Sequence, residues 1–102
     1  MHIYKSTHPS VTLTDESIVD FLLAAPKPRE WRSSVDSLTG ETKTRGQVFD
    51  EALALARGLV VRKHAKRGQV ALVLGKTSVD YPVVALGCMA AGLIPSLASA
   101  AW

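Results

Sequence analysis

One stretch of the sequence constrains the fold more than any other: GQVALVLGKTSVDYPVVALGCMAAGLIPSL. It contains an apolar run with two valines, Gln69–Leu74, then a glycine and a polar loop. A helix is predicted to begin near Ser78 or Val79 and to end at Gly92, and a second apolar run, Leu93–Leu97, follows. Two apolar strands joined by a buried helix are typical of a parallel βαβ crossover. The sequence therefore predicts an α/β fold.

The end of the chain also allows a different interpretation. No charged residue occurs from Tyr81 to Trp102, and a run of this length could span a bilayer. Gly92 and Pro95 interrupt the run and are typical of a helix end. We therefore favour a buried helix followed by a strand. A tail-anchored membrane peptide that uses residues 81–102 is kept as an alternative.

The first part of the chain predicts a short helix. Thr14 is a good N-cap residue, and Pro26 ends the helix by Ala25 or sooner. Before this helix, Val11 and Leu13 alternate with threonines, a pattern that fits a short edge strand.

The middle of the chain predicts a β-hairpin and then the longest helix. The hairpin pairs Ser33–Leu38 with Thr42–Thr44 across a turn that contains a glycine. The helix is predicted over Arg45–Lys63, since apolar residues repeat there at helical spacing. Thr44 and Gln47 have the spacing of a capping box at its start.

Length and composition limit the class of protein. A chain of 102 residues forms at most one domain, and its 47% hydrophobic content is typical of a folded chain. The net charge of +3 is too small to imply a nucleic-acid partner. Met1–Ser10 lacks the apolar core of a secretory signal, and the last residues match no peroxisomal or lipidation signal. We expect an intracellular, cytoplasmic protein.

The loop after the first apolar run lies where a phosphate-binding loop would lie. Gly75, Lys76 and Thr77 follow a predicted strand and precede a predicted helix. A P-loop needs a further glycine five positions earlier, so that backbone N–H groups can surround the phosphate, and that position is Val70. We therefore predict a solvated Lys76 and a helix capped by Thr77 or Ser78.

A basic cluster, Arg62–Arg67, could bind an anionic partner. No aromatic residue is interleaved with it, so we interpret these cations as solvating a turn and offsetting the dipole of the preceding helix. Asp80, beside Tyr81 near a predicted helix start, is interpreted in the same way, as an acidic residue in the first turn.

The histidines and the single cysteine predict no reactive centre. His2, His8 and His64 lack metal-ligand spacing with one another and with the cysteine. Cys88 lies among apolar residues, where a small core residue is expected rather than a nucleophile. A single cysteine cannot form an internal disulfide, so nothing indicates secretion. From the residues themselves we predict no catalytic, cofactor-binding or metal-binding side chain.

Four stretches, taken in order, carry a family pattern. They are Ile3–Ser6 with Pro9 and Val11; Thr14–Leu23; Val35–Asp36 with Thr39, Gly40 and Thr44, continuing through Ala52, Ala56 and Leu59; and Gly68–Leu74 with Tyr81–Cys88, Ala91–Gly92 and Ser96–Ala98. Their order and spacing resemble the beginning of the adenylate-forming (AMP-binding) superfamily, which includes acyl-CoA synthetases, 4-coumarate–CoA ligases and beetle luciferases. The resemblance covers nearly the whole chain.

The resemblance implies a truncated AMP-dependent synthetase/ligase domain over residues 1–102. Residues 1–43 would form the opening segment, first helix and hairpin, and residues 44–98 an α-β-α-β unit. Members of the family use ATP and Mg²⁺ to join a carboxylate to AMP, and then pass the acyl group to coenzyme A. The family's phosphate loop, ribose-binding aspartate and C-terminal lysine have no counterpart here, so no site residue is carried over. We expect the chain alone to be inactive and to hold no cofactor.

The predicted sheet also suggests how the chain binds partners. A parallel sheet is normally covered on both faces and flanked by further strands. A sheet of only two strands has open edges, so we expect marginal stability. We expect pairing with itself or with a longer ligase chain, and no membrane partner. A small interaction module that uses these open edges is the alternative function.

Overall fold

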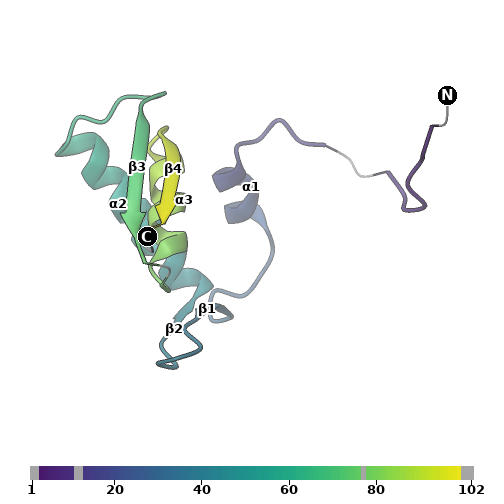
Figure 1. Ribbon diagram of the computed structural model, residues 1–102, viewed down its shortest axis with the longest axis horizontal. Coiled ribbons are helices and arrows are strands. Elements are labelled where there is room, and N and C mark those ends of the chain that lie inside the picture. Colours follow the sequence, from purple (N-terminus) through teal and green to yellow (C-terminus); the bar gives the residue numbers. More distant parts are fainter. Residues whose placement is uncertain (1–2, 11–12, 77, 100–102) are drawn as a thin grey trace.

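The structure is a computed structural model that describes residues 3–10, 13–76 and 78–99. The elements, shown in Figure 1, are α1 (Ile18–Ala24), β1 (Arg32–Val35), β2 (Thr42–Thr44), α2 (Arg45–Val61), β3 (Val70–Gly75), α3 (Tyr81–Ala90) and β4 (Ile94–Ser99). β1 and β2 form an antiparallel hairpin, and β3 and β4 form a parallel pair. The predicted α/β fold with one parallel crossover is therefore confirmed.

Helix α1 begins later than the sequence predicts. Its N-cap is Ser17, whose Oγ accepts the backbone N–H of Asp20 at 3.1 Å, and not Thr14. Thr14 Oγ1 instead accepts the N–H of Glu16 at 3.2 Å in a local turn. The later start has a physical reason: Asp15, Glu16 and Ser17 bring no apolar side chain to pack, whereas Val19 is buried.

The segment before α1 runs away from the rest of the molecule (Figure 1). Val11 of the predicted edge strand lies outside the described residues, and Leu13 belongs to no strand. Within α1 only Val19 is buried, while Ile18 and Phe21 remain 62% and 55% exposed. The N-terminal third of the chain therefore adds little to the core.

The hairpin is shorter than predicted, because Asp36 turns the chain. β1 ends at Val35 rather than Leu38. The Asp36 carboxylate accepts the backbone N–H of Leu38 at 2.8 Å and that of Thr39 at 3.2 Å, and its carbonyl oxygen accepts the N–H of Gly40 at 2.8 Å. Aspartate side chains commonly stabilise a turn by accepting a hydrogen bond from the backbone N–H group two residues ahead.

Helix α2 begins as predicted and ends slightly earlier. The capping box is confirmed: Thr44 Oγ1 accepts the N–H of Gln47 at 3.2 Å, and Gln47 Oε1 accepts the N–H of Thr44 at 2.8 Å. The helix ends at Val61 and not at Lys63. Just beyond it, His64 has a left-handed φ of 53°, which a helix cannot continue through.

The core lies mainly where α2 packs against α3. Its buried apolar side chains are Val19, Val48, Phe49, Ala52, Ala56, Val79, Val83, Cys88 and Leu93. Gly87 of α3 lies close against α2. A Cβ at this position would lie 2.7 Å from Leu55 Cδ2 and 3.0 Å from the carbonyl oxygen of Ala52. Only glycine leaves space for the two helices at this separation.

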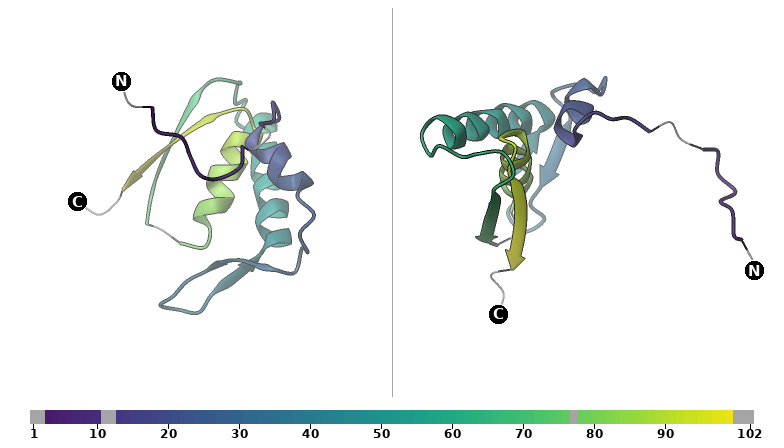
Figure 2. Two further views of the ribbon diagram at one scale, coloured as in Figure 1. Left: turned by 90° about the vertical axis from the view of Figure 1, so that its right-hand side faces the viewer. Right: turned by 90° about the horizontal axis from the view of Figure 1, so that it is seen from above.

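The crossover is present with small shifts in its boundaries. β3 and β4 are parallel, with Val70 opposite Ile94 and Gly75 opposite Ser99. Each strand begins one residue later than predicted, and each extends beyond its predicted end. The right-hand view of Figure 2 shows the strand pair beside the two packed helices, with the N-terminal segment away from it.

Helix α3 is shorter than predicted at both ends. It begins at Tyr81, with Pro82 in its first turn, where a residue without an N–H group is tolerated. It ends at Ala90, and Gly92 reverses the chain with a φ of 83°. From Tyr81 to Ser99 the uncharged stretch is therefore a helix followed by a strand, not one continuous helix. Among the residues described, no helix has both the length and the apolar character to cross a membrane.

Candidate functional site

The loop between β3 and α3 is the first place to look for a site, since ligands of open α/β sheets bind at the carboxyl ends of strands. Here Ser78 accepts hydrogen bonds from backbone groups of the same loop. Ser78 Oγ accepts the N–H of Asp80 at 3.2 Å, and the carbonyl oxygen of Ser78 accepts the N–H of Tyr81 at 3.1 Å. Lys76 is exposed, as predicted. Val70, where a phosphate loop would have glycine, begins β3.

The helix cap in this loop differs from the prediction. The N-cap of α3 is Asp80, and its side chain makes no capping hydrogen bond. Ser78 lies two residues before the N-cap and its Oγ accepts the N–H of Asp80, while Thr77 lies outside the described residues. Pro82 is accommodated because it lies in the first turn of α3, where its missing N–H is not needed.

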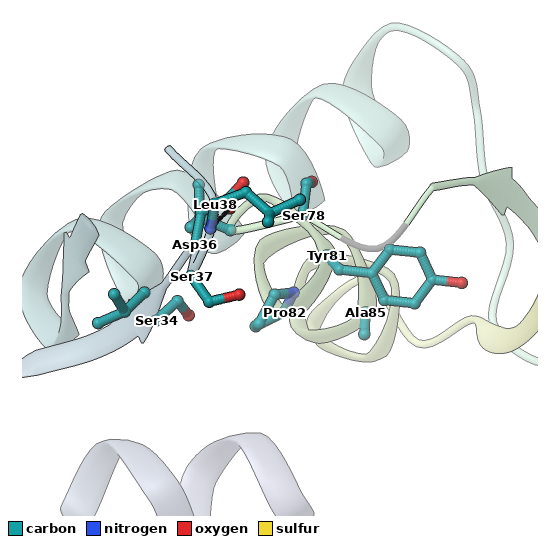
Figure 3. Close-up of a pocket in the computed structure, with 10 residues that line it drawn as sticks. Ser34, Asp36, Ser37, Leu38, Ser78, Tyr81, Pro82 and Ala85 are labelled. Atoms are coloured by element: carbon teal, nitrogen blue, oxygen red, sulfur yellow. Dashed lines mark hydrogen bonds between the residues drawn. The ribbon is translucent and has the colours of Figure 1, made fainter. Parts of the chain in front are cut away.

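A pocket of about 520 Å³ lies beside the loop, between the hairpin turn and the start of α3 (Figure 3). Its lining residues are Ser34, Val35, Asp36, Ser37, Leu38, Ser78, Val79, Tyr81, Pro82 and Ala85. Figure 3 shows the Tyr81 ring extending away from Ser34 and Asp36. The pocket contains hydroxyl groups, but none of its lining side chains among the described residues is a histidine, lysine or arginine that could activate one.

Asp36 is the one carboxylate that lines this pocket. The N–H groups of Leu38 and Thr39 lower its pKa below the ordinary value of 3.8. A general acid or base works best with a pKa near the operating pH. Asp36 is therefore suited to hold the turn in its ionised form, not to transfer protons.

Lys43 joins three elements in an ion cluster that the sequence did not reveal. Its Nζ lies 2.6 Å from Glu51 Oε2 on α2 and 3.0 Å from Asp80 Oδ1 before α3. The Lys43 side chain is only 14% exposed. The hydrogen bond to Glu51, and then that to Asp80, raise the pKa of Lys43 above 10.5. Asp80 is thus an ion-pair partner, a role that its helix-start position does not indicate.

The basic cluster is exposed but lies beyond the helix that it was expected to stabilise. Since α2 ends at Val61, Arg62 is its C-cap and its last turn contains no basic residue. The cations therefore follow the helix end and cannot offset its dipole from within the last turn. No ion pair involves Arg62–Arg67 in the part of the chain that the structure describes.

The remaining candidates are placed apart from one another. Cys88 is a free cysteine 5% exposed in the core, and burial raises its pKa, so its thiol is poorly suited to nucleophilic attack. His8 and His64 are both exposed, one in the N-terminal segment and one after α2, and His2 lies outside the described residues. Over residues 3–10, 13–76 and 78–99, no cluster of three or more potential metal ligands occurs.

A second, more apolar groove of about 420 Å³ runs between α1, β1 and the two packed helices. Arg45 lies along it. The guanidinium donates hydrogen bonds to the carbonyl oxygens of Leu22, Ala25 and Lys27 at the end of α1, and its Cζ lies 4.8 Å from the Phe49 ring centroid. Arg45 therefore attaches α1 to α2.

Comparisons with known proteins agree on one family. Residues 23–102 match the family model described as AMP-binding enzyme. Over 93 residues, 89% of this chain, the sequence is 31% identical to 4-coumarate–CoA ligase-like 1 of Arabidopsis thaliana and spans 17% of it. The structure resembles a fatty acid AMP ligase from Legionella pneumophila with a TM-score of 0.62 and 28% identity, covering 78% of this chain and 14% of that one. The chain thus spans less than a fifth of these relatives.

Proposed function

This chain belongs to the AMP-binding enzyme family, and we propose that it supplies the opening framework of an AMP-forming acid ligase and has no adenylating activity alone. One observation carries the proposal: in the β3–α3 loop, where a nucleotide would be expected, Ser78 accepts the backbone N–H groups of Asp80 and Tyr81, and the Asp80 carboxylate pairs with Lys43. The family match and the resemblance to the Legionella ligase support the framework role, because α2, β3, α3 and β4 all lie in the matched residues.

The reaction to which such a framework belongs follows from the relatives' names. One relative is named as a CoA ligase-like protein and the other as a fatty acid AMP ligase. We infer that the complete enzyme activates a carboxylic acid with ATP and Mg²⁺ and uses coenzyme A as acceptor. The proposal includes a cytoplasmic location, which a single free cysteine supports.

The residues described here do not fit ATP or Mg²⁺. Phosphate binding needs converging N–H groups or cations, and Mg²⁺ needs free carboxylates. The carboxylates near the β3–α3 loop are already engaged, Asp80 with Lys43 and Asp36 with the turn. What the chain offers is a packed crossover that can hold one end of a larger sheet in place.

Pyrophosphate exchange tests this proposal. The purified chain is incubated with ATP, Mg²⁺, labelled pyrophosphate and a panel of fatty and aryl acids, beside a complete family ligase as the positive control. We expect exchange with the complete enzyme and only background with this chain. Exchange that depends on the added acid and scales with the chain concentration would overturn the proposal.

An interaction module is the second candidate function, and exposed strands favour it. Val70, Leu72 and Leu74 of β3 are between 64% and 71% exposed, which is unusual for a parallel strand. The candidate predicts that a tagged chain co-purifies with one defined partner in fixed stoichiometry. Recovery of a heterogeneous aggregate would count against it.

A further inference from the structure

The β3–β4 sheet has helices on one face and an open face on the other. In Figure 1 the strand pair lies in front of α2 and α3, and the left-hand view of Figure 2 places both helices on one side of it. Successive side chains of a strand point to opposite faces of its sheet. Val70, Leu72 and Leu74 are 67%, 71% and 64% exposed, whereas the residues between them are half-buried. The three exposed residues therefore lie on the face away from the helices.

The neighbouring strand extends this open face. Ile94 lies opposite Val70 in the parallel register and is 55% exposed. Residues that are paired across two strands share a face of the sheet. The open face, here named the outer face, consists of Val70, Leu72, Leu74, Ile94, Ser96 and Ala98. None of these residues is charged, and Ser96 alone among them is polar.

The pattern of β3 is that of a strand covered on both faces. A sheet with one solvated face alternates apolar and polar side chains, whereas parallel strands buried on both faces are apolar throughout. β3 reads VALVLG, with no polar side chain at any position. Its largest apolar residues, Leu72 and Leu74, belong to the outer face and not to the face that the helices cover. The outer face therefore has the composition of a packing surface.

The family match indicates what covers such a surface. Parallel strands are joined by crossovers that usually place helices on both faces of the sheet. The helices that the structure describes do not supply the second layer, since α1 and α2 both pack against α3. This chain spans 17% of the Arabidopsis relative and 14% of the Legionella ligase, so more than four-fifths of each protein lies outside the matched segment.

We propose that the outer face is the docking surface for an amphipathic helix from the part of an AMP-forming ligase that lies outside this segment. The apolar stripe of the helix packs on Leu72 and its apolar neighbours. Ser96 and Ala98 are short, so the helix can lie closer to β4 than to β3. The inference rests on the proposed framework function and adds to it the surface and the kind of segment that binds there.

Co-expression with a shortened ligase tests the docking. The segment that this chain matches is deleted from the Legionella ligase, and the remainder is produced together with the tagged chain. We expect the unmodified chain to capture the shortened ligase. Leu72→Lys places a charge beneath the docked helix and should reduce capture at least about tenfold, whereas Leu72→Ile should retain it. Because Leu72 is 71% exposed, both variants should stay folded, which circular dichroism checks.

Cysteine labelling tests the same surface without a charged variant. This chain replaces the matching segment of the full-length Legionella ligase, and Leu72→Cys is labelled with a maleimide both in this hybrid and in the isolated chain. Mass spectrometry follows each labelled site. The Leu72→Cys thiol should react at least about tenfold more slowly in the hybrid. Lys63→Cys, at an exposed position after α2, is the control and should react at similar rates in both proteins.

The outcomes separate this inference from the proposed function. Equal capture by the unmodified chain and Leu72→Lys, or equal labelling of Leu72→Cys in the two proteins, overturns the docking surface and leaves the framework role standing. Slow labelling of Leu72→Cys in the isolated chain also overturns it, since a second copy or another segment of this chain then covers the outer face. Failure of the unmodified chain to capture the shortened ligase counts against it as well. Pyrophosphate exchange by the chain alone overturns the proposed function instead.

Discussion

Gly87 of α3 lies so close to Leu55 of α2 that a side chain on α3 has no space there. A Cβ at position 87 would be 2.7 Å from Leu55 Cδ2 and 3.0 Å from the Ala52 carbonyl oxygen. The leucine end can move, but the backbone oxygen cannot move without displacing the helix. This contact sets the separation of the two helices and so fixes the helix between β3 and β4.

Gly87→Ala is therefore expected to destabilise the chain by overpacking. The cost should be about 1–3 kcal/mol of unfolding free energy, which urea denaturation measures. Combining it with Leu55→Ala should recover part of the loss, because the leucine contact is then removed.

Gly58→Ala in α2 is the matched control for this prediction. No heavy atom lies within 4 Å of a Cβ at position 58. Alanine is a better helix former than glycine, so this variant should be neutral or more stable by up to about 1 kcal/mol. Equal destabilisation by the two variants would contradict the close-packing account.

The capping box of α2 gives a second prediction. Thr44→Ala removes the side-chain acceptor of the Gln47 N–H and should lower the unfolding free energy by about 1 kcal/mol. Thr14→Ala is the control, since Thr14 precedes α1 without capping it. Its effect should stay within about 0.5 kcal/mol. A larger loss from Thr14→Ala than from Thr44→Ala would show the cap assignments to be wrong.

Lys43 predicts a stability change in alkaline solution. Its hydrogen bonds to Glu51 and Asp80 raise its pKa above 10.5. A raised pKa means that the stabilisation is fully present below that value and is lost as the pH rises through the folded-state pKa. Urea denaturation between about pH 9 and pH 12 should show the advantage of the unmodified chain over Lys43→Met shrinking. Parallel curves for the two proteins would contradict the ion cluster.

Asp36 predicts the opposite dependence in acid. The N–H groups of Leu38 and Thr39 lower its pKa below 3.8. Its contribution is present above that value and is lost as the pH falls through the folded-state pKa. Titration followed by the carboxyl ¹³C shift of Asp36 should therefore give a midpoint below 3.8. A midpoint at or above this value would show that the turn does not bind the carboxylate.

The sequence predicts those elements whose signals are local. The capping box places the start of α2, and the apolar runs place β3 and β4 to within a residue at their starts. Gly92 and Pro95 likewise mark in the sequence where α3 ends and β4 follows. In each case one or two neighbouring residues decide the outcome, so no tertiary information is needed.

The features that the sequence does not predict depend on contacts between distant residues. Lys43 and Asp80 are far apart along the chain, so the ion cluster has no spacing signal. Thr14 and Ser17 are both good caps, and the helix begins at the one that directly precedes the segment containing the buried Val19. The closeness of Gly87 to Leu55 follows only once the two helices are docked.

Binding of Mg²⁺–ATP tests most directly the central claim that the crossover is framework and not a nucleotide site. Amide ¹H–¹⁵N spectra of the chain are recorded as Mg²⁺–ATP is added, and the signals of Gly75, Lys76, Ser78 and Asp80 are followed. We predict no saturable shift of these signals at millimolar nucleotide. Saturable shifts confined to this loop, and lost in Lys76→Ala, would contradict the claim.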